Sequence, residues 1–117
     1  MDWEFKANYK SEKDFQKDYI HFLKLCWYWV YKLPDIGFSL KPFDIVALKK
    51  WKAYAIELKY WEVYDYEKIY KMLRPNQVGW LLHFQEHWGI SKVVWFDKKS
   101  WLVYEYPFKY IDYQWAL

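Results

Sequence analysis

The chain has 117 residues, of which 55% are hydrophobic and 28% charged, with a formal net charge of +3. This length fits one domain with one core, over residues 1–117, and the hydrophobic content excludes an intrinsically disordered chain. The positive charge is compatible with a nucleic-acid partner but is below that of a protein that coats DNA.

The first predicted element is a helix over about residues 11–25. Ser11, followed three residues later by Asp14, is typical of a helix N-terminus, and apolar residues then recur at helical spacing. Glu12 lies in the first turn, where a carboxylate stabilises the helix dipole. The aromatic and β-branched residues of 27–33 predict a strand after it.

Residues 42–48 and 53–59 predict two further strands, joined by a four-residue basic connection. Each strand is an apolar run interrupted by ionisable residues, Asp44 in the first and Glu57 and Lys59 in the second. A strand buried on both faces is almost wholly apolar, so these charges indicate a site rather than a structural need.

If the two strands form a hairpin with Leu48 opposite Ala53, Asp44 faces Glu57. Two carboxylates at facing positions repel each other unless one is protonated or a cation lies between them. Their hard oxygens suit Mg²⁺ or Mn²⁺ better than zinc. Lys59 shares a face with Glu57, where its amine can orient a water or offset charge that develops on a phosphate.

A second long helix is predicted over residues 75–89, because Pro75 suits a first helical position and Gly89 a stop. A second hairpin over 92–96 and 101–106 follows. The strands before and after this helix should be parallel through a right-handed crossover, which gives an α/β fold with a mixed central sheet flanked by helices. Four helix residues are expected on one face: Gln77, Leu81, Phe84 and Trp88.

Pro42-Phe43-Asp44, followed after twelve residues by Glu57-Leu58-Lys59, resembles the signature of the PD-(D/E)xK nuclease superfamily. Phe43 is a departure, since it separates the proline from the aspartate. The resemblance implies an α-β-β-β-α-β core and a Mg²⁺-dependent endodeoxyribonuclease, with Mn²⁺ able to substitute, that leaves a 5′-phosphate. Small Holliday junction resolvase-type members are the most similar, and they cut branched DNA as homodimers.

The resemblance assigns roles to the residues. Asp44, Glu57 and the backbone carbonyl of Leu58 are expected to bind the metal. Lys59 is expected to position the hydrolytic water and to stabilise the pentavalent transition state. Because the first helix of such enzymes often contributes a glutamate, Glu12 is the expected additional residue that binds or tunes the metal.

Further residues are expected to contact the substrate. Gln77 matches a glutamine that opens the corresponding helix in the family and approaches the substrate or the metal-bound water. Ser39, Lys41 and Lys32 match a serine and basic residues ahead of the catalytic aspartate, and so are expected at phosphates. The alternative for each is an ordinary solvated side chain.

Other functions remain open. The chain can be a general nuclease or a flap- or end-processing phage or repair nuclease, or an inactive nuclease fold that binds DNA. The sequence His83-Phe84-Gln85-Glu86-His87 matches the HxxEH pattern of zinc peptidases, but no third zinc ligand is identifiable. The surplus of aromatic residues fits a large core, a dimer interface or base stacking equally well.

The expected partner is DNA, branched or duplex, and the expected location is intracellular. Arg74 is the only arginine, so recognition of the backbone is favoured over reading of guanine bases. A lone Cys26 allows no internal disulfide, no signal peptide is visible, and the apolar run 25–30 is too short to span a membrane. A phage- or virus-encoded enzyme also fits.

Overall fold

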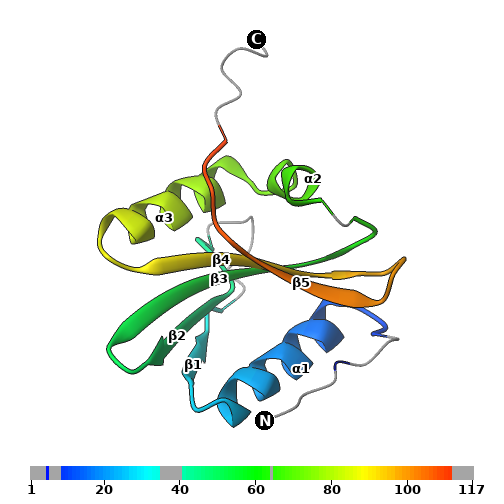
Figure 1. Cartoon of the computed structure of the whole chain (residues 1–117), viewed down its shortest axis with the longest axis horizontal. Helices are drawn as coiled ribbons and strands as arrows, with labels where there is room; N and C mark the ends of the chain where they lie inside the picture. The colour runs from blue at the N-terminus through cyan, green and yellow to red at the C-terminus, as the bar shows by residue number, and fades with distance from the viewer. Residues whose placement is uncertain (1–4, 6–8, 35–40, 64, 112–117) are drawn as a thin grey trace.

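The computed structural model of the chain describes residues 5, 9–34, 41–63 and 65–111 (Figure 1). Five strands form one sheet in the order β1-β2-β3-β4-β5, in which β3 and β4 are parallel and the other neighbours antiparallel. The predicted mixed α/β sheet is therefore confirmed. The elements are α1 (Glu12–Leu25), β1 (Trp29–Lys32), β2 (Ile45–Lys49), β3 (Lys52–Trp61), α2 (Tyr66–Tyr70), α3 (Pro75–Glu86), β4 (Ile90–Asp97) and β5 (Leu102–Pro107).

Helices cover both faces of the sheet, α1 on one face and α2 with α3 on the other (Figure 1). Two apolar clusters fill the spaces between these layers. On the α1 face the buried residues include Phe15, Tyr19, Leu23, Ile45, Ile56, Leu58, Val94 and Phe96. On the α2–α3 face they include Ala55, Ile69, Leu73, Leu81, Val93 and Trp95.

The helix ends follow the predicted signals in part. α1 begins after Ser11, whose hydroxyl accepts a hydrogen bond from the Asp14 N–H (3.2 Å), as predicted. α3 begins at Pro75 as predicted but ends at Glu86, before Gly89 is reached. Trp88 therefore lies beyond the helix and is 98% exposed, so the prediction that it shares one helix face with Gln77, Leu81 and Phe84 is wrong.

The β2–β3 hairpin has the predicted register, with Leu48 opposite Ala53. The pairing continues to Lys49 and Lys52, so the connection is a two-residue turn and not the predicted four-residue one. Residues 50 and 51 both have positive φ, 48° and 68°, which is the geometry of a type I′ turn. This turn matches the twist of the strands and fixes which residues face each other across the hairpin.

Two shorter elements differ from the sequence expectation. β1 covers only Trp29–Lys32 of the predicted 27–33, because Trp27 terminates α1. α2 (Tyr66–Tyr70) is a short helix between β3 and α3, in a stretch for which no element is predicted above, and the Asp65 side chain caps it by accepting the Glu67 N–H. None of the helices among the described residues is long and apolar enough to cross a membrane.

Candidate functional site

β3 carries charged residues into the interior on one face only. Ile56 and Leu58 belong to the apolar cluster under α1, and alternation along the strand therefore directs Glu57 and Lys59 to the α2–α3 face. The side chain of Glu57 is only 2% exposed and that of Lys59 only 16%. The predicted shared face is thus confirmed, and it is largely shielded from solvent.

Asp44 lies one residue before β2, beside Glu57. Its N–H donates to the carbonyl of Ile56 (3.2 Å), one residue out of the hairpin register, which ends at the Ile45–Ile56 pair. The carboxyl groups of Asp44 and Glu57 are nevertheless close enough to repel each other. Oδ2 of Asp44 accepts the Leu58 N–H (2.8 Å), and Oδ1 contacts Nζ of Lys41 at 2.8 Å. The two carboxylates are therefore neighbours, although the pairing that would place them directly opposite each other stops at Ile45.

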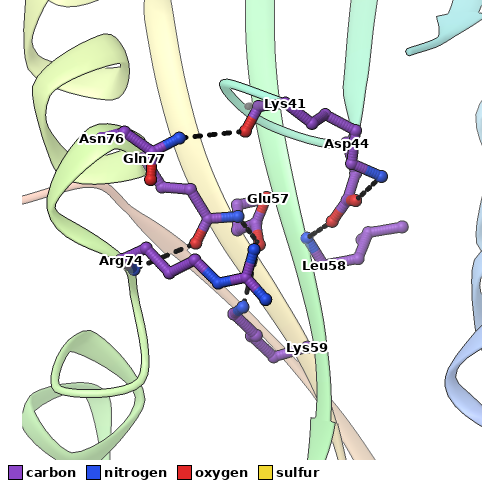
Figure 2. Close-up of polar contacts among 8 residues, drawn as sticks. All are labelled: Lys41, Asp44, Glu57, Leu58, Lys59, Arg74, Asn76 and Gln77. Atoms are coloured by element: carbon purple, nitrogen blue, oxygen red, sulfur yellow. Dashed lines mark hydrogen bonds and ion pairs between the residues drawn. The ribbon is translucent and has the colours of Figure 1, made fainter. Parts of the chain in front are cut away.

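Glu57 is held from two sides, as Figure 2 shows. Its Oε2 is 3.0 Å from Nζ of Lys59 and accepts a hydrogen bond from Nε2 of Gln77 (2.9 Å). Oε1 of Gln77 accepts the Arg74 N–H (3.1 Å) at the start of α3. Because the Arg74 N–H occupies the side-chain oxygen of Gln77, the amide NH₂ group of Gln77 is directed at Glu57.

The second oxygen of Glu57 is the unusual atom of the site. Among the described residues, Oε1 of Glu57 is the one buried side-chain polar atom without a hydrogen-bond partner. Burial, and then repulsion from Asp44, raises the pKa of the Glu57 carboxyl to about 8, and the ion pair with Lys59 opposes this rise only in part. An unpartnered buried oxygen beside a second carboxylate is a position that a cation would stabilise.

The donors present suit a hard divalent cation. Asp44 and Glu57 offer carboxylate oxygens. Within a strand the N–H and C=O of one residue point to the same neighbouring strand, so the Leu58 carbonyl is directed to the side of Asp44. However, no third acidic, histidine or cysteine side chain joins the pair within the described part of the chain.

Two residues of the predicted site lie elsewhere. Glu12 is exposed at the first position of α1, and α1 covers the face of the sheet opposite to Glu57, so the structure does not bring the two together (Figure 1). Lys32 pairs with Ile45, which belongs to the apolar cluster under α1, so the Lys32 side chain also leaves the sheet on the α1 face. This side chain is exposed. Ser39 lies outside the described residues.

Two site residues follow from tertiary contacts that sequence reasoning did not find. Asn76, in the first turn of α3, donates from Nδ2 to the carbonyl of Lys41 (3.4 Å) and so attaches the segment before Asp44 to the helix. Arg74 holds Gln77 through its backbone N–H. The one local sequence signal near these residues was Pro75, which marks the start of α3. It does not indicate which residues the first turn of the helix contacts.

The HxxEH pattern forms no metal site in the described structure. His83 in the last turn of α3 and His87 at its C-cap are both exposed, with ring centroids 4.3 Å apart, and Nδ1 of His87 is 2.9 Å from the His83 carbonyl. No set of three potential ligands is found around them among the described residues. The geometry gives the zinc peptidase hypothesis no support.

Comparisons with known proteins agree with the fold. Neither a family model nor a curated protein sequence matches the chain. Among solved structures it is similar to Hjc of Archaeoglobus fulgidus, a Holliday junction resolvase from an archaeal hyperthermophile, with a TM-score of 0.60 and 21% sequence identity. The similarity covers 81% of this chain and 75% of that chain. At this identity the likeness establishes the α/β fold and not the activity.

Proposed function

We propose that this chain is a metal-dependent endodeoxyribonuclease of the PD-(D/E)xK superfamily. The observation that carries the proposal is the buried pair of Asp44 and Glu57, with an unpartnered Glu57 oxygen and the Lys59 ammonium beside it. Such a group is unusual in a purely structural interior, because burying ion pairs is generally less favourable than burying apolar residues of similar volume. The fold shared with Hjc supports the proposal independently.

Mg²⁺, for which Mn²⁺ substitutes, would be held by Asp44, Glu57 and the Leu58 carbonyl, and would supply charge stabilisation and a more acidic water. Lys59 holds its ammonium against Glu57 at the same place, where it orients the attacking water and offsets charge on the phosphate. Gln77 fixes the Glu57 carboxylate. The water oxygen then bonds to phosphorus and loses a proton as the P–O3′ bond breaks. One new end keeps the 5′-phosphate, and the departing oxygen takes up a proton to become a 3′-hydroxyl.

The substrate we propose is branched DNA, cut by a homodimer. Hjc, with the similar fold, is a Holliday junction resolvase. Two strands of a junction have to be cut, so two active sites are needed. With a single arginine, the chain is poorly equipped to read bases and better suited to the backbone and shape of DNA.

The test is to incubate the protein with a labelled four-way junction, a flap and a linear duplex, in Mg²⁺ and in EDTA. Symmetric nicks in the junction that vanish in EDTA are the expected result. Cleavage of all three substrates would indicate a general nuclease, and binding without cleavage would indicate an inactive DNA-binding module. Light scattering on the same sample reports whether the chain is a dimer.

Lys59→Ala tests the site itself. This variant should bind the junction as the wild type does and lose cleavage by about 10²-fold or more. Lys52→Ala, at the exposed start of the same strand, is the matched control and should cleave normally. Persisting activity in Lys59→Ala would show that the site has been assigned wrongly.

A further inference from the structure

Both oxygens of Asp44 are bonded within the protein, and the two bonds differ in kind. Oδ2 accepts a backbone hydrogen bond from Leu58 at 2.8 Å, which is part of the fixed sheet geometry. Oδ1 is bound by Nζ of Lys41, also at 2.8 Å, through a flexible side chain that is 14% exposed. Lys41 thus occupies the oxygen of Asp44 that is not committed to the backbone.

Each of the two acids already has one lysine ammonium within ion-pair distance. Lys41 pairs with Asp44 and Lys59 pairs with Glu57, so the two carboxylates face two ammonium groups. A divalent cation between the acids would bring two more positive charges to within a few ångströms of Lys41. Like charges at that distance in a shielded site repel strongly, so the cation and Lys41 compete for Oδ1.

The backbone on either side of this ion pair is anchored. The Lys41 carbonyl accepts a hydrogen bond from Asn76 of α3, and the Asp44 N–H donates to Ile56 of β3. The Lys41 side chain can therefore swing away while Asp44 keeps its place. An ammonium released in this way stays beside the site, where the phosphates of a nucleic acid would attract it.

We infer that Lys41 is an internal counter-ion which the divalent cation displaces from Asp44, so that this residue sets the metal affinity. The inference rests on the proposed function. It assigns Lys41 a role as a competitor of the metal for Asp44, in addition to the phosphate contact expected from the sequence.

Calorimetric titration of Mn²⁺ into the full chain tests this inference without any activity assay. Lys41→Met should bind Mn²⁺ about five- to tenfold more tightly than the wild type, since it removes a competing charge. Lys41→Arg keeps the charge and should bind as the wild type does. Lys32→Met removes an exposed charge from the opposite face and should also leave the affinity unchanged.

Thermal melting provides a second readout. Without metal, Lys41→Met should melt below the wild type, because Asp44 loses its counter-ion, and Mn²⁺ should raise its melting temperature by more. Unchanged or weaker Mn²⁺ binding by Lys41→Met, with the wild type binding normally, would overturn the inference alone. No Mn²⁺ binding by either protein would overturn the proposed function as well.

A separate observation concerns the tryptophans. Glycine has free access to positive φ, whereas a residue with a Cβ is strained there. Five described residues other than glycine have positive φ, and neither of the two described glycines does. The five are Trp27 (69°), Lys50 (48°), Trp51 (68°), Trp88 (71°) and Trp101 (61°).

Two of these tryptophans end helices at the position where glycine is most common. At the end of α1, the Trp27 N–H donates to Lys24 and the Tyr28 N–H donates to Leu23, each at 3.1 Å. This pair of hydrogen bonds is the Schellman motif, whose left-handed residue is usually glycine. The Trp88 N–H donates to Gln85 (3.2 Å) in the same manner at the end of α3.

The other two lie in hairpin connections. Trp51 is the second central residue of the type I′ turn, a position that glycine dominates. Trp101 is the last residue of the connection between Asp97 and Leu102, and it takes the left-handed conformation that glycine favours there.

The four indoles contribute little to the packing. Trp27, Trp51, Trp88 and Trp101 are 86%, 106%, 98% and 62% exposed. Trp95 is the contrast, because it is fully buried and its Nε1 donates to the Val63 carbonyl at 2.9 Å. The whole chain has 10 tryptophans and only 3 glycines. Tryptophan is thus in excess and glycine is scarce, as expected if tryptophan stands at positions that suit glycine.

We infer that glycine is the natural residue at positions 27, 51, 88 and 101, and that the codon behind these tryptophans is UGA. UGA is a stop in the standard genetic code and is read as tryptophan in some variant codes and as glycine in others. Positions 27, 51, 88 and 101 would then serve as turn and helix-end residues, and their exposed indoles would be no stacking platform for bases.

The gene and the native protein test this directly. UGA at the four positions, UGG at Trp95, and native peptides lighter by the tryptophan–glycine mass difference are the expected results. UGG at the four positions, or tryptophan in the native peptides, would overturn the inference.

Recombinant variants give an independent measurement. A chain with all four Trp→Gly substitutions should melt about 10 °C or more above the chain with tryptophan, since strain is relieved at each position. Trp95→Gly should melt lower, because it opens a cavity in the core. An unchanged or lower melting temperature for the fourfold variant would contradict the inference.

Discussion

The two faces of the sheet use neighbouring residues of one strand in opposite ways. On the α1 face, Ile56 and Leu58 join a cluster that is almost wholly apolar. On the α2–α3 face, Glu57 and Lys59 are set among apolar residues, and Gln77 of α3 supplies a polar contact to Glu57. The α1 face therefore stabilises the fold through apolar burial. The α2–α3 face is less stabilising, because it buries charged groups where apolar residues would otherwise pack.

The sharpest test of this contrast is Glu57→Gln. Cleavage should fall by about 10³-fold, because the substitution removes a carboxylate from the proposed metal site. The metal-free variant should nevertheless be more stable than the wild type near pH 8, since a neutral amide avoids the desolvation of a buried charge. Nuclease assays and thermal unfolding measure the two effects, and a variant that loses both activity and stability would contradict the division between the faces.

The opposite face is tested by Phe96→Ala. Phe96 is 1% exposed and packs against Tyr9, Phe15 and Tyr60 on the α1 face. Its truncation should lower the free energy of unfolding by about 3–5 kcal/mol, because of lost burial and the cavity left behind. Urea denaturation measures this loss. At a temperature where the variant is folded, cleavage per molecule should be retained, and a selective loss of activity would show that the faces are not independent.

The pH dependence of stability also separates the two faces, because the ionisable group with the raised pKa, Glu57, lies on the α2–α3 face. The pKa of Glu57 is raised from its ordinary value of 4.5 to about 8, so between these values the native state binds more protons than the unfolded state. The free energy of unfolding of the metal-free protein should therefore fall as the pH rises from 4.5 to about 8. The Glu57→Gln variant should lack this contribution, and Mn²⁺ affinity in the wild type should increase over the same range, because the metal needs the ionised carboxylate.

A smaller effect is expected from Gln77→Ala. This residue contacts Glu57 and holds it in position, so its loss should reduce cleavage by about 10- to 100-fold. Gln77→Glu, which places a third negative charge beside the pair, should weaken cleavage but strengthen Mn²⁺ binding. If Gln77→Ala changes stability and leaves cleavage intact, the glutamine has only a structural role.

The smallest effect is expected from Glu12→Ala. Glu12 begins α1 on the face away from the site, so its removal should leave cleavage unchanged and cost only about 0.3–1 kcal/mol from the helix dipole. Steady-state kinetics and thermal unfolding are the measurements. A strong loss of cleavage would mean that Glu12 acts at the site after all, as the family resemblance led us to expect.

The sequence by itself determined the alternation of the central strands, the helix start at Ser11, and the shared face of Glu57 and Lys59. These features depend on local periodicity and on capping, which are properties of short segments. The nearness of Asp44 to Glu57 was also predictable, because a tight hairpin fixes its register once one facing pair is known, although that register ends at Ile45 and Ile56. The length of its turn was not, since Lys50 and Trp51 carry no recognisable turn signal.

Only the tertiary structure decided the surroundings of the two acids. It attached Lys41 to Asp44 and Asn76 to Lys41, placed Gln77 against Glu57, and put Glu12 on the other side of the sheet. Such contacts join residues whose separation depends on how helices pack across the sheet, and local sequence patterns hold no information on that packing. The two acids and Lys59 were therefore visible in the sequence, whereas the contacts that Lys41, Asn76 and Gln77 make around them became visible only in the fold.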